Sequence, residues 1–398
     1  MTLPVLRLRD RADSRLRAGH VWIYSNEIDV GQTPLKSVAP GAQVAIETAR
    51  GKPLGVALAN PNTLICARLF SRDPEARMDR SQLVHRLKIA LALRERCFAT
   101  PHYRLVYGDS DGLPGLVIDR FGDACVVQIS VAGMELLKDE IIDALDKVIR
   151  PTTLIFKNDG KMREQEGLPS YVDVVRGSAE GGIELIENGV KFLAPVLEGQ
   201  KTGWFYDHRL NRQFLQSQVA GKRVLDVFSY IGGWGIQAAV AGASETTLID
   251  SSDFALECGR RNAALNGVED RVKTLTGNAF EKMKELCEAG ERFDVVVLDP
   301  PALIPRRKDQ DKGEQAYAQA NRLALRLLAK DGLLVSASCS MHLPEARLLD
   351  IIRGSARQID RFVQVYAQGH QGPDHPILPA IPETSYLKAY FVRSLPSF

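Results

Sequence analysis

The sequence predicts an α/β protein in three parts: a small β-barrel, a small α+β domain and a larger doubly wound domain. Three observations predict this fold class. Residues 1–72 hold short strand-like runs separated by turns, residues 73–180 mix a long helical pattern with strands, and residues 181–398 alternate strands and helices. The second boundary lies in the flexible stretch 177–182, which is rich in glycine. We therefore expect domains at 1–72, 73–180 and 181–398.

The composition is that of a globular protein with nearly balanced charge. Of 398 residues, 45% are hydrophobic and 25% are charged, and the net charge is +2. A polyanion would have to be held by a local basic patch. Six scattered cysteines, without a CxxC pair or a Cys/His cluster, favour a reducing compartment and no metal site. No signal-like segment and no run near the roughly 18 apolar residues of a membrane span are present, so we expect a cytoplasmic protein without membrane contact.

The first two parts contain short elements. Strands of the barrel are expected at 5–8, 22–24, 43–46, 53–57 and 65–70. A connector helix is expected over 80–98, where apolar residues recur at helical spacing. In the central part we expect strands at 117–119, 125–130 and 153–156 and a helix over 134–149. This central part is too small for a catalytic sheet, and we interpret it as an insert or platform.

Two apolar runs near the end of the chain are each followed by a chemically useful side chain. The run 294–298 is followed by Asp299 and two prolines, and the run 332–337 is followed by Cys339 between two serines. Both runs are typical of buried strands in a parallel sheet, where neighbours lie about 4.8 Å apart. Ligands bind at the carboxyl ends of such strands. We therefore expect Asp299 and Cys339 to open into one crevice.

A glycine-rich turn follows the first strand of the C-terminal part. The strand 222–226 ends at Asp226, and Gly232 and Gly233 follow before a helix. A dinucleotide site would place GxGxxG directly after the strand. An acidic residue first and glycines second suits S-adenosylmethionine, whose methionine part carries an ammonium and a sulfonium. A structural turn without a ligand is the alternative.

Further positions extend this predicted cofactor site. Asp250 ends the next strand and is expected to accept both ribose hydroxyls, or to cap the following helix. Asn278 follows the third strand, where an adenine amino group would lie. Lys201 and Arg209 are assigned to the cofactor carboxylate or to RNA phosphates, with a solvated helix face as the alternative. The predicted cofactor contacts are Lys201, Arg209, Asp226, Phe228, Tyr230, Gly232, Gly233, Asp250, Ser251, Asn278, Ala279 and Asp299.

These motifs resemble those of a known family. Residues 185–398 resemble class I S-adenosylmethionine-dependent methyltransferases, and the whole chain resembles the bacterial 23S rRNA large-subunit methyltransferase I family, which methylates C5 of a cytosine. The matching segments are 19–25, 108–119, 199–212, 227–233, 299–301, 338–340 and 382–388. The resemblance implies an N-terminal PUA domain, a central α+β domain and a Rossmann-like catalytic domain. One departure is Asn278, where the family usually carries Asp, although an amide still offers an acceptor to adenine.

Methylation at C5 requires a nucleophile, because C5 of cytosine does not attack a methyl group directly. A thiolate that adds at C6 makes C5 enamine-like. We assign Cys339 as this nucleophile, with a buried structural cysteine as the alternative, and Asp299 as the partner of the cytosine amino group or N3–H. The loop after Asp299 lacks the second cysteine of many cytosine enzymes, and no residue is identified that removes the C5 proton. Guanine N-methylation on the same scaffold, and a noncatalytic RNA-binding assembly factor, remain the alternatives.

The expected partner is 23S rRNA or a large-subunit precursor, and a homodimer is left open. Predicted RNA-binding residues are Arg7 and Arg9 in the barrel and Arg306, Arg307 and Lys308 in the loop after Asp299. We interpret that loop as a mobile basic flap with Gly313 as its hinge, with a solvated surface loop as the alternative. Candidates for stacking on bases are Trp204, Phe205 and Tyr230, with packing in the core as the alternative. Asp374 and His375 are interpreted either as part of the base pocket or as a structural turn.

Overall fold

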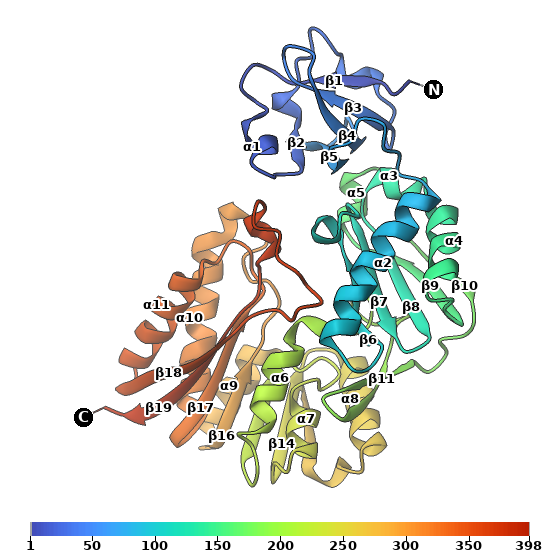
Figure 1. Cartoon of the computed structure of the whole chain (residues 1–398). Helices are drawn as coiled ribbons and strands as arrows, with labels where there is room; N and C mark the ends of the chain where they lie inside the picture. Colours follow the sequence, from blue (N-terminus) through green and yellow to red (C-terminus); the bar gives the residue numbers. More distant parts are fainter. Residues whose placement is uncertain (1, 398) are drawn as a thin grey trace. The chain divides into compact units, whose positions relative to one another are not determined.

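Residues 2–397 are described by a computed structural model, and the chain divides into two units that interleave along the sequence. Unit 1 holds the chain up to Ile183 together with Pro195–Trp204 and Pro373–Thr384. Unit 2 holds the remaining segments. Many elements of both units are labelled in Figure 1. No helix within the described range is both long and apolar enough to cross a membrane.

The first sheet of unit 1 has five strands in the order β1-β3-β4-β5-β2. These strands are β1 (Val5–Arg7), β2 (Trp22–Tyr24), β3 (Gln43–Glu47), β4 (Pro53–Ala59) and β5 (Ile65–Ser71). Along β3, Val44 and Ile46 are fully buried while their neighbours are partly exposed, as the two-residue period of a strand requires. A bridge between Leu8 and Ile28 brings the two edge strands together. All five strands predicted in this part are therefore confirmed.

The second sheet of unit 1 is larger than the sequence predicted. Its order is β10-β9-β8-β7-β6. The strands are β6 (His102–Tyr107), β7 (Leu116–Phe121), β8 (Ala124–Ile129), β9 (Thr153–Asn158) and β10 (Tyr171–Arg176). Of these, β6 and β10 were not predicted. The connector helix is confirmed as α2 (Arg80–Cys97), whereas the helix predicted over 134–149 is two helices, α3 (Ala132–Glu135) and α4 (Lys138–Val148).

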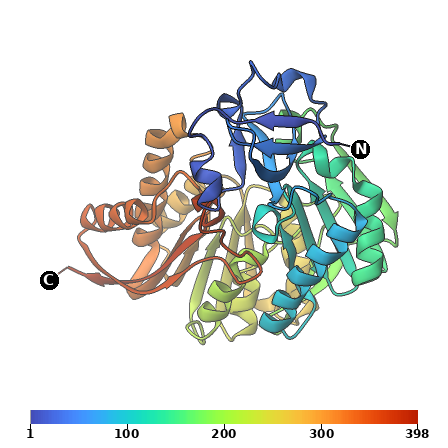
Figure 2. The ribbon, with the colours of Figure 1, turned by 45° about the horizontal axis from the view of Figure 1, so that its top comes forward.

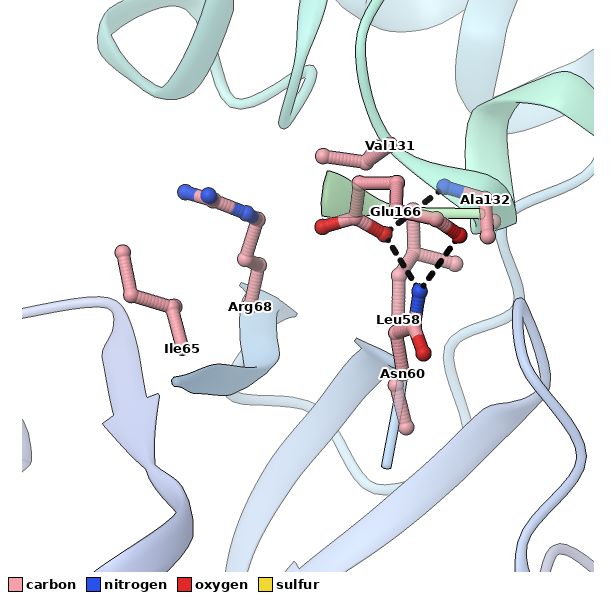
Figure 3. Close-up of a pocket in the computed structure, with 9 residues that line it drawn as sticks. Leu58, Asn60, Ile65, Arg68, Val131, Ala132 and Glu166 are labelled. Atoms are coloured by element: carbon pink, nitrogen blue, oxygen red, sulfur yellow. Dashed lines mark hydrogen bonds between the residues drawn. The ribbon is translucent and has the colours of Figure 1, made fainter. Parts of the chain in front are cut away.

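Hydrogen bonds that Glu166 accepts join the barrel to the central domain within unit 1. Glu166 follows α5 (Met162–Gln165), and one of its carboxylate oxygens accepts from Asn60 Nδ2 at 2.7 Å and from the Ala132 N–H at 3.2 Å, as Figure 3 shows. The cavity beside these residues measures about 10 Å³. Because a volume of this size admits a single water, this place is a structural joint and not a ligand site.

Unit 2 is built on a seven-stranded sheet in the order β15-β14-β13-β16-β17-β19-β18. Its strands are β13 (Arg223–Val227), β14 (Glu245–Asp250), β15 (Val272–Thr276), β16 (Phe293–Leu298), β17 (Leu328–Ser338), β18 (Arg361–Gly369) and β19 (Lys388–Pro396). All neighbours pair in parallel except β19, which is antiparallel to β17 and β18. The order reverses between β13 and β16, which is where doubly wound sheets bind ligands. A short hairpin, β11 (Ile183–Glu187) and β12 (Val190–Ala194), precedes the sheet.

Helices cover both faces of this sheet, because successive strand residues point to opposite faces. In β16, Val296 and Leu298 pack with α9 (Ala279–Glu288), α10 (Gln310–Leu327) and α11 (Glu345–Arg357). Val295 and Val297 pack instead with α6 (Arg209–Gln216) and α7 (Gly235–Val240). Figures 1 and 2 show α10 and α11 together on one side of the strands. The doubly wound architecture predicted for the C-terminal part is confirmed.

Candidate active site

Four polar side chains lie at one edge of the unit 2 sheet. Asp226 is paired with Leu248 of β14 and Val297 of β16, close to the carboxyl ends of three parallel strands. Asp250 ends β14, Asp299 follows β16 and Cys339 follows β17. Because β16 and β17 are parallel neighbours, the predicted adjacency of the strands that end at Asp299 and Cys339 is confirmed. The structure thus brings together the residues that the sequence singled out after separate strands.

Asp226 is a fully buried carboxyl group with an incomplete set of partners. Its Oδ2 accepts a hydrogen bond from the Gly235 N–H at 2.8 Å, and its Oδ1 has no partner among the described residues. Burial raises the pKa of Asp226 to about 7, an effect that the Gly235 hydrogen bond only partly offsets. A buried polar atom without a partner requires an explanation. A bound cation beside Oδ1 would supply one.

The turn between β13 and α7 is tight because glycines occupy its crowded positions. A Cβ on Gly232 would lie 2.6 Å from Ile236 Cδ1, and Gly232 has a φ of 83°. Phe228 and Tyr230 also adopt positive φ values, of 64° and 50°. Such values are uncommon outside glycine, and they cluster at functional sites. Together with the unpartnered oxygen of Asp226, this strained turn fits a cradle for a small cationic ligand.

Asp250 fixes the same turn from the neighbouring strand. Its Oδ2 accepts from the Tyr230 N–H at 2.8 Å and its Oδ1 from the Ser252 N–H at 2.9 Å. Each oxygen keeps a further lone pair, since a carboxylate accepts about four hydrogen bonds. The next helix, α8 (Asp253–Leu265), is capped by Ser252, whose hydroxyl accepts from the Ala255 N–H. The alternative interpretation of Asp250 as the helix cap is therefore wrong.

Asn278 and Ala279 lie where β15 turns into α9. The Asn278 Oδ1 accepts from the backbone N–H groups of Phe280 and Glu281, at 2.9 and 3.4 Å, and so caps the helix. Asn and Asp cap helices about equally well, which gives a structural reason why an amide is tolerated here. The oxygen expected to accept from adenine is thus already engaged by the helix. Phe280 packs edge-to-face against Phe228, with ring centroids 6.2 Å apart, so the turn has an aromatic wall.

Two residues that the sequence analysis did not assign hold Asp299. His208 Nε2 lies 3.2 Å from Asp299 Oδ1, and Trp234 Nε1 donates to Asp299 Oδ2 at 3.0 Å. Asn211 Nδ2 lies 3.0 Å from His208 Nδ1, and in a neutral imidazole that accepts at Nδ1 the hydrogen is on Nε2. Burial alone would raise the pKa of Asp299, but His208 and Trp234 outweigh it and the pKa lies below its ordinary value. Asp299 is therefore a carboxylate at neutral pH.

Asp299 acts on His208 in return. Burial alone would lower the pKa of His208, but Asp299 and Asp207 outweigh it and the pKa lies above its ordinary value. Within the matched segment 199–212, His208 offered no periodic or spacing signal that singled it out. Its pairing with Asp299 depends on contacts between distant parts of the chain.

Cys339 is held by its flanking serines while its own thiol is half-buried. The Ser338 and Ser340 hydroxyls both bond the Tyr317 hydroxyl of α10 at 2.8 Å. Cys339 Sγ lies 3.9 Å from the Pro300 carbonyl oxygen, in the loop that begins at Asp299. Burial raises the pKa of the Cys66 and Cys125 thiols to about 12, as expected for packing residues.

The two basic residues predicted to hold the cofactor carboxylate lie in different surroundings. Arg209 is buried, its Nε lies 3.6 Å from Glu187 Oε2, and its guanidinium lies over the Tyr206 ring. Glu187 also accepts from Arg212 at 2.7 and 3.2 Å. Lys201 belongs to unit 1, where it is exposed and has a positive φ of 52°.

Three of the predicted RNA-binding arginines already have protein partners. Arg7 pairs with Glu47 at 2.8 Å, Arg9 Nε donates to the Ile28 carbonyl at 3.1 Å, and Arg306 pairs with Asp309 at 2.8 Å. Arg307 and Lys308 are exposed in the short turn η6 (Arg307–Asp309). Charged side chains therefore do line this loop.

One interpretation outside the core of the site is wrong, and for a second position the structure favours one of the two alternatives. Gly313 is not a hinge, because it lies within α10, where a Cβ would meet Ile304 Cγ1 at 2.3 Å. Asp374 and His375 are buried in unit 1, and Asp374 accepts from the Arg104 N–H and from His375, so the structural-turn interpretation holds.

The predicted stacking candidates also differ from one another. Trp204 is buried, whereas Phe205 and Tyr230 are partly exposed with ring centroids 5.5 Å apart. Within residues 2–397, no group of three or more His, Cys, Asp or Glu side chains could hold a metal ion.

Comparisons with known proteins match two separate parts of the chain to family models and nearly the whole chain to relatives. A model of S-adenosylmethionine-dependent methyltransferases matches residues 167–374, and a model of PUA-like domains matches residues 6–72. Ribosomal RNA large subunit methyltransferase I of Aeromonas hydrophila is 35% identical over 401 residues, covering 99% of this chain and 100% of that protein. The protein of the same name from Erwinia tasmaniensis is 32% identical over 399 residues, with coverage of 99% and 100%.

Solved structures show the same fold. A putative S-adenosylmethionine-dependent methyltransferase from Streptococcus mutans superposes with a TM-score of 0.83 at 19% identity, covering 98% of this chain and 99% of that one. A putative methyltransferase complexed with S-adenosylhomocysteine gives the same TM-score, identity and coverage. These likenesses confirm the predicted fold class.

Proposed function

Because the chain belongs to the ribosomal RNA large subunit methyltransferase I family of S-adenosylmethionine-dependent methyltransferases, we propose that it methylates C5 of a cytosine in 23S rRNA through a covalent adduct of Cys339. The observation that carries this proposal is the half-buried Cys339 thiol, 3.9 Å from the Pro300 carbonyl in the loop that begins at Asp299. A loop that carries only a carboxylate could bind many kinds of methyl acceptor. A thiol beside it is what a pyrimidine ring carbon requires.

The turn after β13 has the features that the cofactor requires. The unpartnered Oδ1 of Asp226 would face the cationic methionine part, and Asp250 would accept from the ribose hydroxyls with the lone pairs that its backbone partners leave. Gly232 and Phe228 would border the ligand through their strained backbone. When bound, S-adenosylmethionine supplies the electrophilic methyl group.

Cys339 would act as the nucleophile in this reaction. Its thiolate adds to C6 of the cytosine, which places electron density on C5 so that C5 can accept the methyl group. Loss of the C5 proton to solvent and departure of the Cys339 thiolate then restore the C5–C6 double bond. The buried serines on either side hold the strand end in place while the thiol stays accessible.

Asp299 would stabilise the adduct. Addition at C6 increases the basicity of N3, which takes up a proton from solvent and returns it when the Cys339 thiolate departs. A carboxylate beside the ring can accept hydrogen bonds from this N3–H and from the amino group. His208 and Trp234 support this role because they keep Asp299 ionised and hold its two oxygens in fixed directions. Positioning by such neighbours is what a preorganised site requires.

The RNA would be held by exposed basic residues and by the barrel. Arg307 and Lys308 follow the Asp299 loop, and Arg7 and Arg9 lie in the PUA-like part. The target cytosine would have to be unstacked to reach Cys339, as for other enzymes that modify bases. Phosphate contacts of this kind weaken as salt rises.

The proposal is tested by a nucleoside digest of unmodified large-subunit rRNA after incubation with the protein and S-adenosylmethionine, analysed by mass spectrometry. New 5-methylcytidine is the expected result. A methylated guanosine would overturn the cytosine assignment and reduce Cys339 to a structural residue. The absence of any methylated nucleoside, from both free rRNA and precursor particles, would reject the activity altogether.

Substitution Cys339→Ala should reduce 5-methylcytidine formation to background while cofactor affinity stays within about twofold, since the thiol attacks the base and does not hold the cofactor. Cys258→Ala is the matched control, because Cys258 is buried in α8 of the same unit. Calorimetry reports the affinity and mass spectrometry the product. Undiminished methylation by Cys339→Ala would refute the covalent mechanism.

A further inference from the structure

Lys388 is a buried lysine whose hydrogen-bond partners carry no charge. It is the first residue of β19, and only 7% of it is exposed. Its Nζ donates to the carbonyl oxygens of Ser340, at 2.7 Å, and Leu343, at 2.9 Å. Lysine is almost never fully buried unless it is paired. Two neutral carbonyls are a weak compensation for a desolvated ammonium, so the position calls for a further explanation.

Both carbonyls belong to the turn that directly follows Cys339. In the sheet, Lys388 is the register partner of Ser338, the residue before Cys339. The turn itself is closed by a hydrogen bond from the Leu343 N–H to the Ser340 carbonyl at 3.2 Å. Lys388 therefore joins β19, the last strand along the chain, to the residues on both sides of Cys339. A substitution of Lys388 would therefore alter Cys339 in two ways: through the position of the backbone turn and through the loss of the lysine charge.

We propose that Lys388 is a positioning residue for Cys339. The Lys388 ammonium holds the 340–343 turn and favours the thiolate form of the cysteine. A nearby cation is the usual means by which proteins activate a cysteine. The inference rests on the proposed function, because it assigns Lys388 a part in the reaction of Cys339. It goes beyond that function in naming the source of the positive charge.

The charges around Lys388 agree with this role. Burial lowers the pKa of Lys388 to about 8, whereas Cys339 and Glu345 of α11 act in the opposite direction. From α10, Tyr317 is also sensitive to the charge of Cys339, which raises the pKa of its phenol after the larger effect of burial. The ammonium is thus present at pH 7 and is lost near pH 8. Its effect on the thiol should disappear over the same range.

The experiment measures how fast iodoacetamide alkylates Cys339 as a function of pH, in the full chain without RNA or cofactor. Peptide mass spectrometry follows Cys339 and, as an internal reference in the same digest, the exposed Cys97. Lys388→Met removes the charge at similar length, and Lys388→Gln removes the charge but keeps N–H donors for the carbonyls. Tyr390→Phe is the matched control, because Tyr390 donates from the same strand to the Glu345 carbonyl without carrying charge.

In Lys388→Met and Lys388→Gln, alkylation of Cys339 at pH 7 should be about tenfold slower, and its profile should move up by about one pH unit. Tyr390→Phe should follow the unsubstituted protein at every pH, and Lys388→Arg should follow it up to about pH 7, because both side chains are then charged. Above about pH 9 the unsubstituted protein should converge with the two neutral variants, because its ammonium is then neutral as well, whereas the guanidinium of Lys388→Arg stays charged. Circular dichroism and cofactor affinity report whether each variant is folded.

An unchanged profile in a folded Lys388→Met or Lys388→Gln variant would overturn the proposal and leave Lys388 a purely structural residue. If both neutral variants unfold, the test uses the alkylation profile of Cys339 in the unsubstituted protein. A profile without an inflection near pH 8 would equally overturn the proposal. The assay needs no methylation. A shifted profile without 5-methylcytidine would therefore reject the proposed function alone.

Discussion

At the scale of the residue, three aspartates at one sheet edge behave differently because their surroundings differ. Asp226 is buried with one hydrogen bond, and burial raises its pKa to about 7. Burial acts on Asp299 too, but His208 and Trp234 outweigh it and lower the pKa. Asp250 is only partly buried and holds two backbone N–H groups. Titratable groups whose environments move their pKa values apart are a mark of functional sites.

Cofactor affinity should increase with pH on account of Asp226. In the free protein its carboxyl group is about half protonated at pH 7, because its pKa is about 7. A bound cation favours the carboxylate, so binding at pH 7 should release about half a proton, and the Kd should rise by up to about tenfold per pH unit below that value. Calorimetry in two buffers of different ionisation enthalpy measures the proton release.

The control for this prediction is Asp226→Asn, which has no proton to release. Its cofactor affinity should be weaker and should lose the part of the pH dependence that comes from Asp226, while any titration of the cofactor itself remains. The difference between the two proteins therefore isolates the carboxyl group. Identical pH profiles would show that Asp226 does not meet the cationic part of the ligand.

The sequence identified the site residues that follow buried strands, and it missed those that reach the site from elsewhere. Asp299 and Cys339 were predictable because each directly follows an apolar run, and parallel strands place such residues at one edge. His208 and Trp234 contact Asp299 from the margins of α6 and α7, and Lys388 of β19 contacts the turn that follows Cys339; all three lie far from these residues in the chain. No local pattern records such contacts, because they depend on the packing of the whole unit.

At the scale of the element, α10 shows why the sequence predicts a hinge at a glycine that lies within a helix. Gly313 is preceded by charged residues without apolar periodicity, so the beginning of the helix at Gln310 gave no clear signal. In the structure a Cβ at Gly313 would lie 2.6 Å from the Leu303 carbonyl oxygen and 2.3 Å from Ile304 Cγ1. Gly313 therefore permits close packing between the loop after Asp299 and α10, and it does not act as a hinge.

Gly313→Ala should accordingly destabilise the protein by about 1–3 kcal/mol, because overpacking outweighs the helix propensity of alanine. It should also reduce methylation, since Leu303 and Ile304 belong to the loop that carries Asp299. Gly354→Ala in α11 is the control, as its Cβ would meet nothing within 4 Å. That variant should gain about 0.5–1 kcal/mol. Urea denaturation measures both, and equal stabilisation of the two variants would refute the packing argument.

Other elements were missed for reasons that concern their surroundings. The apolar pattern over 134–149 continues through the break between α3 and α4, and no Gly or Pro lies at Leu136 or Leu137 to mark it. The edge strand β10 exposes Val172 and Val174, so it lacks a clear division between buried and exposed positions. The strand forms because it pairs with β9, and a short stretch of sequence does not predict such a long-range pairing.

At the scale of the whole molecule, the chain passes repeatedly between the two units. The segments Pro195–Trp204 and Pro373–Thr384 are surrounded in sequence by unit 2 but belong to unit 1. They are fixed there by buried polar contacts: Thr202 donates to Asp119, and the Asp374 carbonyl accepts from Arg94 at 2.8 Å. No single position in the sequence therefore separates the units, and the boundaries at 72 and 180 stay predictions.

This interleaving predicts that a substitution late in the chain weakens the unit built mainly from its beginning. Asp374→Ala removes a buried carboxylate that accepts from the Arg104 N–H at 3.0 Å and from His375 at 2.9 Å. Leaving these donors unpaired should cost about 2 kcal/mol. Hydrogen exchange followed by mass spectrometry should show faster exchange in α2, β6 and β7 and unchanged exchange in β13 and β16. An exposed aspartate of unit 2, Asp270, provides the control in Asp270→Ala. Equal loss of protection in both sheets would mean that the two units unfold as one.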